Sequence, residues 1–118
     1  MSKTVPLICA LALALLVPAL TLAQTPAPTG TAAAGATKNS MCTGCHGIVG
    51  WRTAYPEVYK VPKIGGQHRD YIIKALMEYK NGERSHPTMR AIATSLSEQD
   101  MADLAAYYSG SAPVTAGK

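Results

Sequence analysis

Apolar residues are spread unevenly along this chain, and their spacing predicts helices rather than strands. The first 23 residues are almost continuously apolar. Further along, two segments carry apolar residues at intervals of three and four, which is the spacing of one helix face. The first of these segments predicts a helix from Arg69 to Lys80 that ends at Asn81-Gly82. Its apolar face consists of Tyr71, Ile72, Ala75, Leu76 and Tyr79.

The second segment predicts a helix from Glu98 to Tyr108. Ser97 is a good N-cap and Asp100 stands three residues later, so the two can form a capping box. The buried stripe of this helix is expected to contain Met101, Leu104, Ala105 and Tyr108. A third, weaker segment predicts a helix from about Ala33 to Cys45. No alternation of period two is long enough to predict a sheet, so we expect an all-α fold with three main helices.

Two long segments, residues 47–66 and 82–95, show no helical pattern and are expected to be loops. Loops of that length are uncommon in a small domain unless they serve a function such as enclosing a ligand. The composition agrees, because the chain has no Phe and few Leu, Ile and Val outside its first 23 residues. We therefore expect a domain whose core is largely a bound group. A length of 118 residues excludes a multidomain enzyme.

The apolar N-terminal segment has the features of a secretory signal peptide. Lys3 provides a positive charge before the apolar run, and Thr21-Leu22-Ala23 places small residues before a cleavage site preceding Gln24. The alternative is an uncleaved membrane anchor, since the run is close to the minimum length of a spanning helix. Cleavage predicts a periplasmic protein. The chain is thus divided into a signal peptide (1–23), a flexible lead-in (24–37), a folded domain (38–110) and a flexible tail (111–118).

The motif that carries chemistry is Cys42-Thr43-Gly44-Cys45-His46, the attachment sequence for c-type haem. The two thiols add across the haem vinyl groups, and their spacing places both sulfurs on one side of a helical turn. His46 follows as the proximal iron ligand. A redox-active Cys-x-x-Cys needs a strand–helix context that this chain lacks, and a zinc site would need His68 and His86 without a finger-like pattern. A plain disulfide would leave His46 without a role.

Around this motif the chain resembles the class I c-type cytochromes, especially small bacterial ones. The matching elements are Cys42 to Gly47, Pro62-Lys63-Ile64-Gly65-Gly66-Gln67, Met89, and Leu96 to Tyr108. The resemblance covers about residues 38–110. It implies a cytochrome c-like fold of three main helices, with the first and last crossing, wrapped around one covalently attached haem. It also implies electron transfer. The segment between Gly47 and Pro62, which includes residues 51–56, is longer than in the shortest members of that family.

The resemblance also implies the ligands of the haem iron. His46 is the proximal ligand, and Met89 stands where the family places its distal ligand. A thioether in that place raises the reduction potential. Met77 and Met101 fall within predicted helices, where core packing is their expected role.

The competing distal ligands are His86 and His68, and a bis-histidine site would have a lower potential. By the same resemblance, the carbonyl of Pro62 accepts a hydrogen bond from the His46 ring, which fixes the ring and increases its basicity. Proline fixes the backbone at that point, and Gly65-Gly66 lets the chain pass close to the haem.

Charge gives little information about partners. The net charge is +4, and loss of Lys3 with the leader together with two ionised propionates brings it close to neutral. No basic run supports binding of nucleic acid. The candidate positive patch, which would steer an acidic redox partner, consists of Lys60, Lys63, Arg69 and Lys74. The candidate donors to haem propionates are Trp51, Arg52, Tyr55 and Tyr59.

These features predict a periplasmic one-electron carrier rather than an enzyme. It is expected to exchange electrons with protein partners, either as a free monomer or as a subunit of a redox complex, and to stay out of the membrane once the leader is removed. One alternative is a haem sensor or peroxidase-like enzyme with a displaceable sixth ligand. The other is a low-potential carrier with two histidine ligands.

Overall fold

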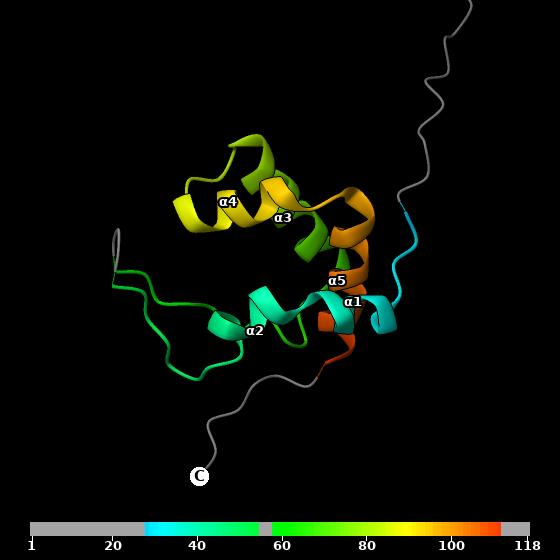
Figure 1. Cartoon of the computed structure of the whole chain (residues 1–118), viewed down its shortest axis with the longest axis horizontal. Coiled ribbons are helices and arrows are strands. Elements are labelled where there is room, and N and C mark those ends of the chain that lie inside the picture. The colour runs from blue at the N-terminus through cyan, green and yellow to red at the C-terminus, as the bar shows by residue number, and fades with distance from the viewer. Residues whose placement is uncertain (1–27, 55–57, 112–118) are drawn as a thin grey trace, which may run out of the picture.

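The computed structural model describes residues 28–54 and 58–111, and this part of the chain is helical (Figure 1). Its helices are α1 (Ala32–Lys38), α2 (Ser40–His46), α3 (Arg69–Asn81), α4 (Pro87–Ser95) and α5 (Glu98–Gly110). The described residues contain no strand, only an isolated antiparallel bridge between Arg52 and Lys60. No helix among them is both long and apolar enough to cross a membrane. The all-α prediction is therefore confirmed. The predicted signal peptide, Tyr55 and Pro56 lie outside the described residues.

The two helices with clear periodicity are found close to their predicted bounds. α3 continues one residue beyond Lys80 and ends at Gly82, whose φ of 84° places it in the left-handed region that favours glycine. α5 begins after Ser97, whose side chain accepts a hydrogen bond from the Asp100 amide while the Asp100 carboxylate accepts one from the Ser97 amide. The predicted capping box is thus confirmed, and it fixes the start of α5.

The helix predicted from Ala33 to Cys45 is divided into α1 and α2 by Asn39. Asparagine is a weak helix former, and here it serves both as the C-cap of α1 and as the N-cap of α2. α1 also begins inside the segment 24–37 that composition predicts to be flexible. Thr31 caps it by accepting a hydrogen bond from the Ala34 amide. Small residues give this segment little apolar surface of its own, so it is ordered by what it packs against.

The loop predicted over residues 82–95 is wrong in its second half, where α4 forms. Pro87 occupies the first turn of this helix, where its missing N–H is no loss, and His86 acts as its N-cap. The apolar residues of α4 and its C-cap also have helical spacing. They are Met89, Ile92, Ala93 and Leu96.

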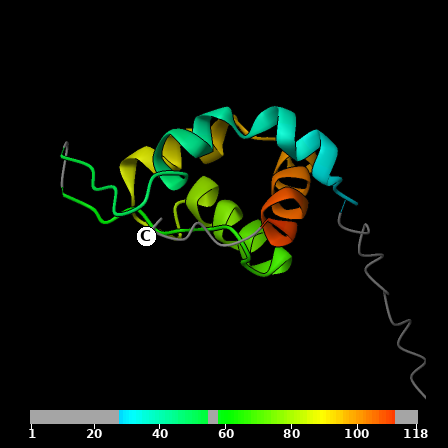
Figure 2. The ribbon, with the colours of Figure 1, turned by 90° about the horizontal axis from the view of Figure 1, so that it is seen from below.

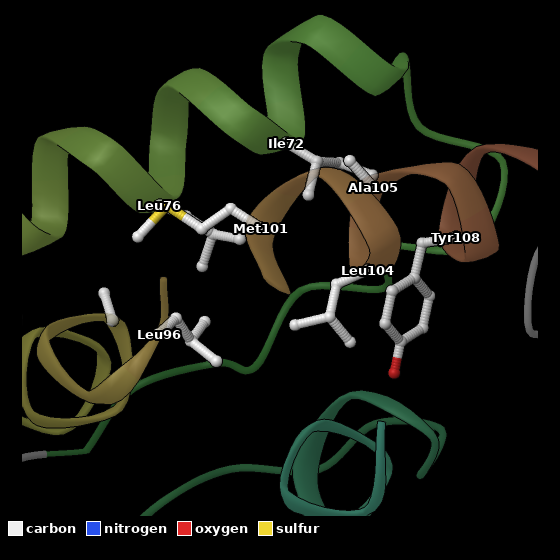
Figure 3. Close-up of a cluster of buried hydrophobic side chains, with 8 residues drawn as sticks. Ile72, Leu76, Leu96, Met101, Leu104, Ala105 and Tyr108 are labelled. Atoms are coloured by element: carbon white, nitrogen blue, oxygen red, sulfur yellow. The ribbon is translucent and has the colours of Figure 1, made fainter. Parts of the chain in front are cut away.

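The apolar core lies where α5 meets α3 and the end of α4 (Figure 3). α3 contributes Ile72 and Leu76, and Leu96 joins from the turn after α4. The buried side chains of α5 include the four predicted from its stripe, namely Met101, Leu104, Ala105 and Tyr108. This cluster is small, which agrees with the scarcity of large aliphatic residues in the sequence.

α1 packs across α5 at very short range, and two glycines make this possible (Figures 1 and 2). A Cβ atom on Gly35 would lie 2.2 Å from the Asp103 carbonyl oxygen, and one on Gly30 would lie 1.9 Å from the Ala102 carbonyl oxygen. No side chain fits in either place. The crossing of the first and last helices, which the family resemblance implies, is therefore present.

A buried carboxylate strengthens the same crossing. Asp103 is only 3% exposed, and Lys38 of α1 places its Nζ 2.7 Å from both Asp103 Oδ2 and Asp100 Oδ1. The Thr31 amide and the Gln99 amide group also donate to Asp103 Oδ1, at 2.8 and 3.1 Å. The hydrogen bonds from Lys38 and then Thr31 lower the pKa of Asp103, and those from Lys38 and Ser97 lower the pKa of Asp100 strongly.

Lys38→Met is expected to destabilise the folded protein near pH 7 and to have a smaller effect near pH 3. The two carboxyls have lowered pKa values in the folded state, so their stabilisation is full above the unfolded value of about 4, begins to decline below it, and is lost only as the pH falls through the folded values. Thermal unfolding at both pH values measures this. We expect a difference of several degrees at pH 7 that narrows at pH 3.

Lys74→Met is the matched control, because Lys74 is exposed and lies 3.8 Å from Glu78 within one helix. Such a pair contributes little to stability. A gap between wild type and Lys38→Met that is equally wide at both pH values would show that the lost interaction is not the pairing with these carboxylates.

Candidate functional site

Residues of α2, α3 and α4 line a cavity of about 350 Å³. In the ribbon, α2 lies across from α3 and α4 (Figure 1). Cys42, Cys45 and His46 line the cavity from α2, and Met89 lines it from α4. The apolar part of its wall includes Ile64, Ile72, Leu76, Ile92, Leu96 and Leu104. The cavity therefore joins the residues of the sequence motif to the expected distal ligand within a largely apolar enclosure.

The two thiols lie on the same side of α2, as their spacing predicts. Both cysteines are half-buried and unpaired, and both line the cavity. Cys42 also packs against the apolar core, and this burial raises the pKa of its thiol. α2 ends directly after these residues, with Gly47 as its C-cap. A short helix thus presents two sulfurs and an imidazole to one space.

The ring of His46 is held by the backbone of the following loop. Its Nδ1 lies 2.6 Å from the carbonyl oxygen of Pro62, which is the contact expected from the family resemblance. The carbonyl can only accept, so Nδ1 carries the proton and donates. Nε2 is therefore the ring nitrogen that remains available to a metal. The loop is held in turn by Gly66, whose φ is 79° and whose amide donates to the Tyr108 carbonyl at 2.9 Å.

The described methionines separate into two groups. Met101 is fully buried in the core and Met77 packs against it, in agreement with the roles expected for them. Met41 and Met89 line the cavity. Met41 is 48% exposed and adjoins the attachment motif on α2, whereas Met89 belongs to α4 on the opposite side. Of the two, only Met89 faces the cavity from the side away from His46.

The histidines named as competing ligands are in different places. His68 is exposed, caps the N-terminal end of α3 and is absent from the cavity lining. His86 does line the cavity, close to Met89. Its Nδ1 accepts a hydrogen bond from the Met89 amide at 3.3 Å. Of the two competing histidines, the structure therefore brings only His86 to the wall of the cavity.

A buried hydroxyl at the cavity is left without a partner. Tyr108 projects from α5 toward α2, and its Oη has no hydrogen-bond partner of good geometry among the described residues (Figure 3). Burial raises the pKa of this hydroxyl, and the nearby Cys42 thiol raises it further. An unpaired buried hydroxyl costs free energy, so it indicates a group with polar atoms as the occupant of the cavity.

The candidate residues of the rim are only partly brought together. Tyr59 lines the cavity, while Trp51 and Arg52 are exposed outside it. Of the predicted positive patch, Lys60 and Lys63 line the cavity. Arg69 instead donates from a terminal nitrogen to the Pro28 carbonyl, and Lys74 faces Glu78. A basic group at the cavity is thus present, but it is smaller than the sequence suggests.

Sequence reasoning missed a second polar cluster, which is centred on Arg84. Its Nε lies 2.6 Å from the Glu78 carboxylate, and its guanidinium lies over the rings of Tyr71 and Tyr79, at 5.4 and 5.6 Å from their centroids. Both tyrosines and Arg84 line the cavity. The tyrosines were expected on the apolar face of the helix, and only the folded turn after Gly82 brings the arginine to them.

Comparison with known proteins gives the family of this chain. The profile of the Cytochrome c family matches residues 31–110, so the chain belongs to the cytochrome c family. It is 39% identical over 83 residues to cytochrome c-554(548) of Halomonas halodenitrificans, covering 68% of this chain and 95% of that protein. It is also 40% identical over 79 residues to cytochrome c4 of Pseudomonas aeruginosa, which covers 67% of this chain.

Solved structures support the same fold. Cytochrome c4 of Acidithiobacillus ferrooxidans superposes with a TM-score of 0.54 at 28% identity, covering 74% of this chain and 54% of that one. Cytochrome c4 of Pseudomonas stutzeri gives a TM-score of 0.54 at 29% identity, covering 72% and 53%. The chain spans 37% of the length of the Pseudomonas aeruginosa cytochrome c4 that it matches.

Membership of this family implies covalently bound haem c, and the cavity fits such a group. Two thiols stand at the spacing of the attachment motif, an imidazole is oriented by a carbonyl, and the enclosure is apolar. The unpaired Tyr108 hydroxyl provides a polar contact within it. These features come from the described residues themselves and agree with the family assignment.

Proposed function

We propose that this chain is a periplasmic one-electron carrier that holds a single haem through Cys42 and Cys45, with His46 and Met89 as the axial ligands. The observation that carries the proposal is the meeting of these four side chains in one apolar cavity. Bound there, haem would supply a one-electron exchange between its ferrous and ferric states. Such an exchange needs no bond-making residue from the protein.

The protein's own contribution is to hold the ligands in place and to exclude water. The 2.6 Å contact between His46 Nδ1 and the Pro62 carbonyl keeps the imidazole in one orientation and one tautomer. Leu76, Leu96 and Leu104 keep the cavity wall apolar. Fixed ligands and an apolar wall that excludes water favour a small rearrangement of the protein when the charge of the bound group changes.

The partners proposed are redox proteins, one that donates and one that accepts the electron. Lys60 and Lys63 are exposed at the cavity and favour a partner with acidic groups around its own redox site. Export to the periplasm rests on the predicted signal peptide with cleavage after Ala23. The mature protein is proposed to be a monomer or a subunit of a redox complex.

An optical redox titration of the holoprotein, followed by addition of carbon monoxide to the reduced form, tests this proposal. We expect one haem per chain that stays attached on denaturation, a reversible one-electron titration, and no rapid binding of carbon monoxide, because both axial positions are filled. Rapid stoichiometric binding would indicate an open site and therefore a sensor or peroxidase-like enzyme. A low midpoint potential without spectroscopic signs of sulfur ligation would indicate two histidine ligands.

A further inference from the structure

The first turn of α4 has an unusual cap. Ser, Thr, Asp and Asn are the common N-cap residues, but here the cap is His86, whose backbone is extended with φ −163° and ψ 107°. Its Nδ1 accepts from the amide of Met89, the third residue of the helix. Pro87 has no N–H to satisfy. The side chain of Met89 thus lines the cavity while its backbone is held by its neighbour His86.

The His86 ring is itself held between two tyrosines from other parts of the chain. Its centroid lies 4.2 Å from that of Tyr59 at an interplanar angle of 38°, and 6.3 Å from that of Tyr79 with the rings nearly perpendicular. Aromatic pairs at these separations contribute beyond the area they bury. All three rings line the cavity. The His86 ring therefore joins the start of α4 to α3, through Tyr79, and to the loop before Pro62, through Tyr59.

The loop that carries Tyr59 has local structure that places this ring. The Thr53 amide donates to the Tyr59 carbonyl at 3.0 Å, and the Tyr59 amide donates to Thr53 Oγ1 at 3.1 Å. The bridge between Arg52 and Lys60 continues the same antiparallel pairing. The segment between Gly47 and Pro62 is longer here than in the shortest family members. Near its end, the ring of Tyr59 packs on His86.

We propose that His86 is a positioning residue, whose cap on the Met89 amide and stack against Tyr59 hold the first turn of α4 so that the Met89 thioether stays at the cavity. The proposal rests on Met89 being the distal ligand, as argued above. His86 is not itself the ligand through Nδ1, because that atom is occupied by the Met89 amide. Ligation through its other ring nitrogen is the rival reading, and the experiment separates the two.

The experiment compares His86→Ala, His86→Asn and Tyr59→Leu in the holoprotein, with Ser85→Ala as an exposed neighbouring control. The readouts are the long-wavelength absorption band that sulfur ligation gives to ferric haem, the rate of carbon monoxide binding to the reduced protein, and hydrogen exchange of the Met89 amide. Loss of one N-cap hydrogen bond changes the equilibrium between the folded and unfolded forms of a helix turn by about fivefold. His86→Ala is therefore expected to raise the fraction of protein without Met89 ligation, and the carbon monoxide rate, by about that factor.

His86→Asn is expected to restore most of the protection of the Met89 amide, because asparagine is a good cap, but not the stacking. Tyr59→Leu is expected to give an intermediate effect, and Ser85→Ala none. If His86→Ala fails to fold, His86→Asn and Tyr59→Leu still test the proposal. A band, rate and exchange profile in His86→Ala equal to those of the wild type would overturn the proposal while leaving the assignment of Met89 intact. A wild type without the band, in which His86→Ala and not Met89→Ala opens the site, would overturn both.

Discussion

Cys42→Ala/Cys45→Ala is expected to give a chain that does not unfold cooperatively. Without covalent attachment, the cavity of about 350 Å³ is left empty or floods with water. Empty volume in a core costs roughly 24 cal/mol per Å³, so a dry cavity of this size would cost up to about 8 kcal/mol. Whole domains are stable by only about 5–15 kcal/mol. The loss is therefore comparable with the entire stability of the protein.

Calorimetry and far-ultraviolet circular dichroism on heating measure this outcome. We expect a broad, gradual loss of helix with no heat-absorption peak, against a sharp transition for the holoprotein. Thr43→Ala is the matched control, because Thr43 is exposed on the same helix and both thiols remain. A cooperative transition in the double cysteine variant would mean that the apolar cluster around Leu104 folds without the bound group.

Met89→Ala is expected to lower the midpoint potential and to open the distal site. A thioether stabilises the ferrous state, and the choice of axial ligands spans about 0.8 V across haem proteins. We expect a fall on the order of 0.1 V, loss of the sulfur-ligation band, and rapid binding of carbon monoxide to the reduced protein. The removed side chain lines the cavity from α4, so the change is confined to that wall.

The control for this variant is Met77→Leu. Met77 packs against the core from α3 and does not line the cavity, so its replacement keeps the apolar volume and should leave potential and spectrum unchanged. Equal midpoint potentials in Met89→Ala and the wild type would show that the distal ligand is another group. His86 would then be the first candidate, since it lines the same wall.

Local sequence signals predicted α3 and α5 because the residues that favour these helices lie within or next to the helices themselves. Each has an apolar face at regular spacing, and Ser97 with Asp100 marks a start that depends on no distant residue. α4 was missed because its cap is a histidine rather than one of the common cap residues, and because Pro87 can end a helix as well as begin one. Spacing at Met89 and Ile92 was the signal that would have found it.

The site was predictable to the extent that it is contained in short motifs. Cys42, Cys45 and His46 adjoin in sequence, and the family resemblance supplied Pro62. The stack of Tyr59 on His86 was not predictable, because it depends on how a long loop folds back across the cavity. The same holds for α1, whose packing depends on Gly35 meeting α5 and not on any apolar stripe of its own.

Among the described helices, the principal packings join α1 to α5, α5 to α3, and α3 to α4, and α2 takes part in none of them. The helix on which we propose that the haem is attached is therefore set apart from these packings; it is connected to α1 through Asn39 and contacts the core at Cys42. Thioethers at Cys42 and Cys45 would attach the haem to α2 alone, and packing of the haem against the α3 and α4 residues that line the cavity would then join α2 to the opposite wall. Because thioethers do not dissociate, this attachment is a step that the protein does not reverse.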